Sequence, residues 1–249
     1  MIEVIAHRGF SAQAPENTLA ALRAALAGGA DAVEWDVHVA ACGTPVLFHD
    51  ETLDRTTDGV GPLADRDFTE LRGLDAGSWF DPAFAGEPIP SFAEALELIG
   101  PSEATVYPEV KGFRRPEDLD AMARTVLKLG MLDRVVFISL DFDAVDRLSL
   151  AHPRVGYVVA RASDVPAALS RASRLDRPGL LDLDYRLLLE EPDLVGRIRN
   201  TGSDVAVWTV DRVREADALA GIGVRRITTN RVASMVRWRA GWTAPSPGA

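Results

Sequence analysis

Short apolar, β-branched runs alternate with longer amphipathic runs from one end of this 249-residue chain to the other. The short runs predict strands near residues 4–6, 33–36, 105–109, 135–139, 155–159, 180–183, 205–208 and 226–229. The longer runs predict helices near residues 18–27, 92–99, 117–129, 142–149, 165–172, 193–200, 212–220 and 232–240. This alternation is expected of βα units around a parallel sheet. Eight such units in about 250 residues are typical of a TIM (β/α)8 barrel, so we expect an α/β fold of this class.

One interval breaks this rhythm, because the connection from Asp36 to Phe92 is far longer than an ordinary βα loop. Residues 45–48 are expected to return beside residues 34–37 as an antiparallel hairpin arm, with a turn around Gly43. The rest of the interval is expected to cover the barrel mouth at which barrel enzymes build their active sites. We therefore predict one barrel domain at residues 1–240, a small cap insertion after strand two at about 45–90, and a disordered tail at 241–249.

Composition limits the possible partners. The formal net charge of −10 argues against a general nucleic-acid surface, but it leaves room for a small anionic substrate in a locally positive cleft. A single cysteine, Cys42, excludes an internal disulfide and cysteine-based metal sites. No apolar run approaches the length of a membrane span, so no stable membrane insertion is expected. The chain begins with a strand pattern and without a signal-peptide pattern, which predicts a cytoplasmic location, while the oligomeric state stays open.

The strand at residues 32–37 carries two acids, Glu34 and Asp36, that are two residues apart. Side chains alternate along a strand, so these two acids share one face while Val33, Trp35 and Val37 share the other. Two carboxylates on one face repel each other unless a cation lies between them, they share a proton, or water reaches both.

Further polar residues follow the strand ends and would converge on the same mouth: His7, Arg8, His49, Glu109 and Lys111. Three carboxylates without cysteine suit a hard divalent cation, Mg²⁺ or Ca²⁺ before Zn²⁺. Two histidines can act as a proton donor and acceptor pair. Arg8 and Lys111 supply fixed positive charge for phosphate oxygens. Together these groups are typical of phosphodiester cleavage.

Other polar residues near the strand ends receive different interpretations. His38 and His152 are expected to be merely solvated, although His38 shares the face of Asp36. Asp182 and Asp184 form a second acidic pair, for which a solvated strand end is favoured over a substrate hydroxyl contact. Trp208 is expected either to pack the barrel rim or to line the substrate channel.

Proline is disfavoured inside a central strand, so Pro108 predicts a β-bulge that re-aims Glu109 into the site. Asn17 is predicted to cap the first helix, and Gly28 and Gly130 are predicted to end helices.

The ordered set of these motifs resembles the glycerophosphodiester phosphodiesterases over nearly the whole chain. The resemblance rests on Ala6-His7-Arg8-Gly9, Pro15-Glu16-Asn17-Thr18, Gly29-Ala30-Asp31, Glu34-Trp35-Asp36-Val37, Pro45-Val46-Leu47-Phe48-His49-Asp50, Arg55-Thr56-Thr57, Ile89-Pro90-Ser91, Pro108-Glu109-Val110-Lys111 and Trp208-Thr209-Val210.

The resemblance implies a TIM barrel that hydrolyses small-molecule glycerophosphodiesters to glycerol 3-phosphate and an alcohol with a divalent cation. It also implies roles for single residues: Glu34, Asp36 and Glu109 as metal ligands, His7 and His49 as the general acid/base pair, Arg8 and Lys111 as phosphate ligands, Glu16 and Asn17 as loop support. Trp208 is the remaining candidate for substrate binding. The expected course is attack by the neighbouring glycerol hydroxyl to give a cyclic phosphate, which water then opens.

Several positions depart from the family pattern. Arg225, Arg226 and Asn230 stand where the family usually has Asp, Gly and Asp, and Asp211 stands where Asn is common. These departures are expected to affect the substrate preference and the geometry of the rim of the site more than the catalytic reaction. Two alternatives therefore remain: a lysophospholipase D-like activity on lysophospholipids, and a non-catalytic barrel that binds a phosphate ligand.

Overall fold

In the computed structural model, which describes residues 1–243, eight parallel strands close into a barrel with helices between them. The barrel strands are β1 (Glu3–Ala6), β2 (Ala32–Val39), β4 (Thr105–Val110), β5 (Phe137–Ser139), β6 (Val155–Val159), β7 (Leu180–Asp184), β8 (Asp204–Trp208) and β9 (Arg226–Thr229). Pairing of β1 with both β2 and β9 closes the sheet. The predicted fold class is therefore confirmed. Most of the tail predicted at 241–249 lies outside the described residues.

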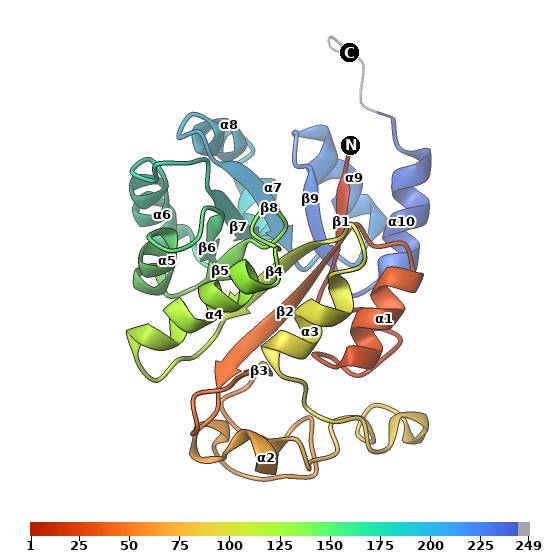
Figure 1. Ribbon diagram of the computed structural model, residues 1–249. Helices are drawn as coiled ribbons and strands as arrows, with labels where there is room; N and C mark the ends of the chain where they lie inside the picture. Colours follow the sequence, from red (N-terminus) through yellow and green to blue (C-terminus); the bar gives the residue numbers. More distant parts are fainter. Residues whose placement is uncertain (244–249) are drawn as a thin grey trace.

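Helices surround the barrel on its outer side (Figure 1). They are α1 (Leu19–Ala27), α3 (Phe92–Ile99), α4 (Pro116–Lys128), α5 (Phe142–Ser149), α6 (Val165–Ala172), α7 (Tyr185–Glu190), α8 (Leu194–Arg199), α9 (Val213–Gly221) and α10 (Val232–Gly241), with a 3₁₀ turn η3 (Ala162–Asp164) before α6. All but the short α7 correspond to the predicted helices. No helix in the described part of the chain combines the length and the apolar character needed to cross a bilayer.

The predicted bulge at Pro108 is wrong. The β2–β4 ladder is continuous from the pair Ala32–Thr105 to the pair Val37–Val110, with Pro108 opposite Trp35. The amide of Val106 points to the β5 side, where it donates to Arg134 O, and residues two apart along a strand point the same way. The missing N–H of Pro108 therefore falls on the β5 side, so the β2–β4 ladder loses no donor.

The barrel interior is filled by an apolar layer below the mouth. It consists of Ile5, Ala32, Tyr107, Val136, Ile138, Val158, Leu180 and Ala206, and Trp208 packs against it. At the opposite end of the barrel, Arg226 pairs with Glu3 and Asp204, and the Tyr107 hydroxyl donates to Glu3. A cavity of about 230 Å³ lies at this end, with Tyr107, Leu180 and Arg226 in its lining, whereas the mouth formed by the carboxyl ends of the strands is the face at which barrel enzymes build their active sites.

A hairpin arm and a cap extend from this mouth. Strand β3 (Pro45–Leu47) pairs antiparallel with the end of β2, which confirms the predicted arm but places it beside residues 37–39 and not 34–37. The segment from β3 to α3 contains η1 (Leu63–Asp65), α2 (Phe68–Leu71) and η2 (Pro82–Phe84). It has a small apolar core of its own that includes Phe48, Leu53 and Leu71. In Figure 1 this orange-to-gold segment projects beyond the end of the barrel toward which β2 points.

Candidate active site

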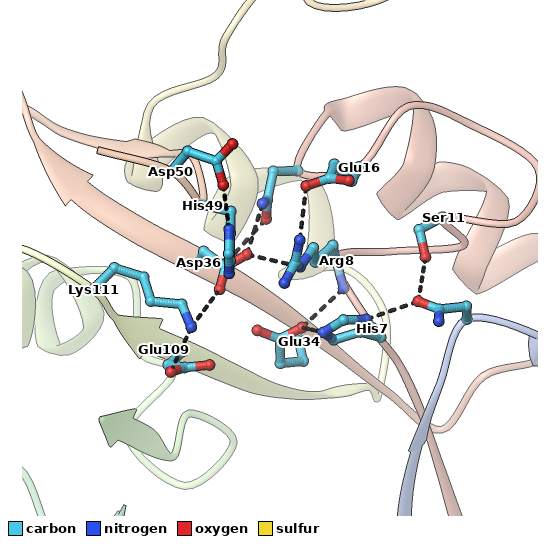
Figure 2. Close-up of polar contacts among 12 residues, drawn as sticks. His7, Arg8, Ser11, Glu16, Glu34, Asp36, His49, Asp50, Glu109 and Lys111 are labelled. Atoms are coloured by element: carbon cyan, nitrogen blue, oxygen red, sulfur yellow. Dashed lines mark hydrogen bonds and ion pairs between the residues drawn. The ribbon is translucent and has the colours of Figure 1, made fainter. Parts of the chain in front are cut away.

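The polar residues predicted from the strand ends meet at one mouth of the barrel (Figure 2). His7 and Arg8 follow β1, Glu34 and Asp36 lie in β2, Glu109 lies in β4 with Lys111 just after it, and His49 follows the arm. A cavity of about 240 Å³ opens there. Its lining comprises His7, Arg8, Glu34, His49, Glu109, Lys111, Leu140, Asp182, Trp208, Thr209 and Thr228.

Glu34, Asp36 and Glu109 form a compact acidic cluster, each with an oxygen within 4.8 Å of the others. Glu34 Oε1 and Asp36 Oδ1 are buried without a hydrogen-bond partner. Burial and the negative charges of Asp36 and Glu109 raise the pKa of Glu34 well above its usual value. Buried oxygens that lack donors and repel one another are what a divalent cation satisfies, so the residues present fit such an ion.

Two cationic side chains flank the cluster. Arg8 Nε lies 3.1 Å from Asp36 Oδ2, and Lys111 Nζ lies 2.7 Å from Glu109 Oε1 and 3.4 Å from Asp36 Oδ1. Burial opposes ionisation of Asp36, but Arg8 and Lys111 outweigh it and lower the pKa of this carboxyl. Both cations also line the cavity, where they are placed to meet an anionic ligand.

The turn after β1 has an unusual backbone. Arg8 has a φ of 54°, and its amide donates to Glu34 Oε2 at 2.8 Å. Gly9 has a φ of +78°, and a Cβ there would lie 2.6 Å from the backbone carbon of Ala21 in α1. Left-handed backbone at a non-glycine residue costs free energy and is characteristic of functional sites. Here it aims both the Arg8 amide and the Arg8 side chain at the acidic cluster.

Asn17 is the main correction in this region. The N-cap of α1 is Thr18, whose Oγ1 accepts from Ala21 N at 3.2 Å, so the prediction that Asn17 caps the helix is wrong. Instead, Asn17 Nδ2 donates to Asp36 Oδ2 at 2.8 Å and Asn17 Oδ1 accepts from Asp36 N at 3.0 Å. Asn17 therefore fixes Asp36, while Glu16 bridges Arg8 and Arg55. Gly28 does end α1, and Gly130 follows α4 with a φ of +69°.

His7 is fixed by an amide and a carboxylate. Its Nδ1 lies 2.7 Å from Asn230 Oδ1, and Asn230 Nδ2 donates to Asp211 Oδ2 at 2.8 Å. A carboxylate only accepts, so the amide nitrogen of Asn230 must face Asp211 and its oxygen must face His7. His7 therefore donates from Nδ1, and its Nε2 faces Glu34 Oε2 at 4.0 Å. Burial and the Arg8 charge lower the pKa of His7 to about 4, which leaves the imidazole neutral at neutral pH.

His49 has a different environment on the arm. Its Nδ1 lies 2.5 Å from Asp50 Oδ1, and Arg55 binds Asp50 from the other side. His38 Nε2 donates to the carbonyl oxygen of His49 at 3.0 Å. The prediction that His38 is merely solvated is wrong, because this side chain is buried and orients the backbone that carries His49.

The remaining candidates divide between the site and the scaffold. His152 is also buried rather than solvated, and its Nε2 donates to Val135 O at 2.8 Å, away from the site. Asp184 caps α7 by accepting from Arg186 N at 2.9 Å. Asp182 lines the cavity and is buried, so the favoured solvated strand end is wrong for it. Trp208 lines the cavity and donates from Nε1 to Asp182 O at 3.2 Å.

Comparisons with known proteins give one consistent answer. A model of the "Glycerophosphoryl diester phosphodiesterase family" matches residues 7–234. A glycerophosphodiester phosphodiesterase of Caldanaerobacter subterraneus is 32% identical over 229 residues, which cover 91% of this chain and 93% of that protein.

Solved structures agree with this match. A phosphodiesterase of Oleispira antarctica, in complex with the product sn-glycerol-3-phosphate, is 29% identical with a TM-score of 0.84, over 96% of this chain and 97% of that one. A glycerophosphodiester phosphodiesterase of Agrobacterium tumefaciens is 29% identical with a TM-score of 0.77, over 94% and 98% of the two chains.

Proposed function

The chain belongs to the glycerophosphoryl diester phosphodiesterase family, and from this membership we infer that it is an enzyme that hydrolyses small-molecule glycerophosphodiesters to glycerol 3-phosphate and an alcohol. One observation carries the assignment of residues. Two imidazoles in different environments, His7 and His49, line the same cavity as the acidic cluster and its two flanking cations.

We propose that Glu34, Asp36 and Glu109 hold one divalent cation, Mg²⁺ or Ca²⁺. The donor set consists of carboxylate oxygens, which suits these hard cations. When bound, the ion supplies Lewis-acid polarisation of a phosphate oxygen. Arg8 and Lys111 bind the other phosphate oxygens and compensate the charge that develops on them.

The environments of the two imidazoles support a proposed division of roles between them. His7 is neutral and donates from Nδ1 to Asn230, so its Nε2 is free to accept the proton of the glycerol hydroxyl next to the phosphate ester. That hydroxyl attacks phosphorus, and the bond between phosphorus and the leaving alcohol breaks. His49, which Asp50 holds through Nδ1, donates a proton to the departing oxygen. Water then opens the cyclic phosphate, with the two imidazoles in reversed roles.

We further propose that Trp208 forms an apolar wall against the carbon chain of the substrate, since it lines the cavity opposite the acidic cluster. The division into a barrel domain at 1–240 with a cap at about 45–90, and the cytoplasmic location, stay predictions from the sequence.

The test is release of glycerol 3-phosphate from glycerophosphoethanolamine and glycerophosphocholine by protein stripped with EDTA and resupplied separately with Mg²⁺ and Ca²⁺. We expect metal-restored release, and the more effective ion identifies the working metal. Lysophosphatidylcholine is the third substrate. Its hydrolysis at the same bond yields lysophosphatidic acid and choline, so choline is the product measured for it. Release of choline from lysophosphatidylcholine without turnover of the two diesters would support the lysophospholipase D-like alternative, and binding of glycerol 3-phosphate without turnover of any substrate would support the binding barrel.

A further inference from the structure

Asp182 lies at the floor of the cavity, where the mechanism above gives it no role. It is the third residue of β7, and it points into the barrel directly above the apolar layer that contains Leu180. Its side chain lines the cavity together with Lys111 and Trp208, yet the residue is only 5% exposed. A buried carboxyl group normally has a hydrogen-bond or ion-pair partner, so a missing partner requires an explanation.

No partner is present among the described residues. Asp182 Oδ1 is fully buried without a hydrogen bond, and no ion pair reaches the Asp182 carboxyl. Its neighbours at the same level of the adjacent strands are Val158 and Ala206, which have no polar side-chain atoms. Lys111, whose charge lowers the pKa of Asp182, is already paired with Glu109 and Asp36. The surrounding scaffold therefore leaves this carboxyl free toward the cavity.

An unpaired buried polar group destabilises a protein, because no hydrogen bond replaces those that it made with water. Such a cost is tolerated at functional sites, where a ligand supplies the missing partner. Asp182 Oδ1 can accept a hydrogen bond, and a carboxyl group also donates one when it is protonated, which burial favours by raising the pKa of Asp182. A hydroxyl group has the same two capacities and is the matching partner.

We propose that Asp182 is a specificity residue that binds a hydroxyl group of the glycerol moiety of the substrate. The proposal rests on the proposed function and adds the part of the substrate that is recognised. The glycerol moiety is common to all substrates of this reaction, so a fixed group at the floor of the cavity can bind it in each of them. The leaving alcohol must depart through the open mouth. A charged ammonium group of that alcohol would be costly to bury beside the apolar layer under Asp182.

The experiment compares two ligands that differ only in their hydroxyl groups. Binding of glycerol 3-phosphate and of propyl phosphate to the Mg²⁺-loaded protein is measured by calorimetry for wild type, Asp182→Leu and Asp182→Asn. We expect Asp182→Leu to weaken glycerol 3-phosphate about tenfold or more and to change propyl phosphate less than twofold. Asp182→Asn, which keeps a donor and an acceptor, is expected to stay within a few-fold of wild type.

The matched control is Asp184→Asn, because Asp184 is on the same strand and caps α7 outside the cavity. It should leave both affinities unchanged. We also expect the melting temperature of Asp182→Leu to equal or exceed that of wild type, because an unpaired buried carboxyl has been removed. Retained folding then separates lost recognition from lost structure.

Three results would overturn the proposal. They are equal weakening of both ligands in Asp182→Leu, unchanged affinity for glycerol 3-phosphate in that variant, or a change in Asp182→Asn of the KM ratio between glycerophosphocholine and glycerophosphoglycerol, whose leaving alcohol is uncharged. The last result would mean that Asp182 contacts the leaving alcohol instead of the glycerol moiety. The calorimetric comparison does not depend on turnover, so it stands apart from a failure of the hydrolysis assay.

Discussion

Exchanging Asp211 and Asn230 tests how His7 is oriented. In wild type, Asn230 Nδ2 donates to the Asp211 carboxylate at 2.8 Å, and Asn230 Oδ1 accepts from His7 at 2.7 Å. Asn230→Asp alone would place two carboxylates against each other at this contact. Asp211→Asn alone would place two amides there, and because Asp211 Oδ1 also accepts from Asn230 N and Thr229 Oγ1, the new amide would turn its nitrogen toward Asn230 Nδ2. In the double variant, Asn at 211 can donate to Asp at 230, so the hydrogen bond is restored with its direction reversed.

The magnitude follows from the bond that is lost and regained. A hydrogen bond to a charged group is worth about 1.5–3 kcal/mol, and each single variant loses it. The double variant regains it, so the coupling free energy in a double-mutant cycle should approach the sum of the two single losses, about 3–6 kcal/mol, both in urea unfolding and in log kcat/KM. Since 1.4 kcal/mol is a factor of ten, we expect each single variant to lose roughly tenfold or more in kcat/KM and the double variant to recover most of it.

The double variant also brings the negative charge into direct contact with His7, which should raise the pKa of His7 from about 4. His7 acts as a base only when neutral, so the acidic limb of the pH profile of kcat/KM should move to higher pH in the double variant. Additive effects of the two substitutions, or wild-type kcat/KM in Asp211→Asn, would refute this account of how His7 is oriented.

Three further predictions concern the acid/base pair, the acidic cluster and the far end of the barrel. His49→Ala should lower kcat by about 10²–10⁴ while Mg²⁺ still raises the melting temperature, and unchanged turnover would reject the role of His49. Wild type should gain about 2.7 kcal/mol of unfolding free energy when the divalent cation is present at one hundred times its dissociation constant. Glu109→Gln should lose most of this gain, and an equal gain in both proteins would place the ion elsewhere. Arg226→Met leaves the carboxylates of Glu3 and Asp204 without their shared cation. It should lower the free energy of unfolding by about 1–3 kcal/mol and leave kcat/KM unchanged. A change in kcat/KM would mean that this end of the barrel affects the site.

The strands and helices could be predicted because their apolar periodicity is local. A buried parallel strand and an amphipathic helix each leave a repeat that can be seen within a few residues. Helix α7 leaves no such repeat, because its six residues begin at Tyr185, immediately after β7 ends. The predicted bulge at Pro108 is wrong for a related reason. The local sequence does not show which neighbouring strand the amide of a given residue faces, and the missing N–H of Pro108 leaves the β2–β4 ladder complete.

The partners of the catalytic groups could not be predicted from local pattern. His7 and Asn230 are 223 residues apart, and they meet because Ala6 pairs with Thr229 when β1 and β9 close the barrel. Closure therefore makes the residues after these two strands neighbours. In the sequence, Asp211 and Asn230 stand out only as departures from the family pattern, and the structure shows that these two side chains are hydrogen-bonded to each other.

Burial shows which polar residues have a structural or binding role, which the local sequence pattern does not show. His38, His152 and Asp182 were all predicted to be solvated, and all three are buried. His152 uses its Nε2 to bind Val135 O inside the scaffold, and His38 uses its Nε2 to orient the backbone of His49. Asp182 differs from both, because its side chain bonds to nothing in the described residues and it faces the cavity. A buried polar side chain that the scaffold satisfies is part of the structure, whereas one that the scaffold leaves unpaired beside a cavity is where a ligand is required.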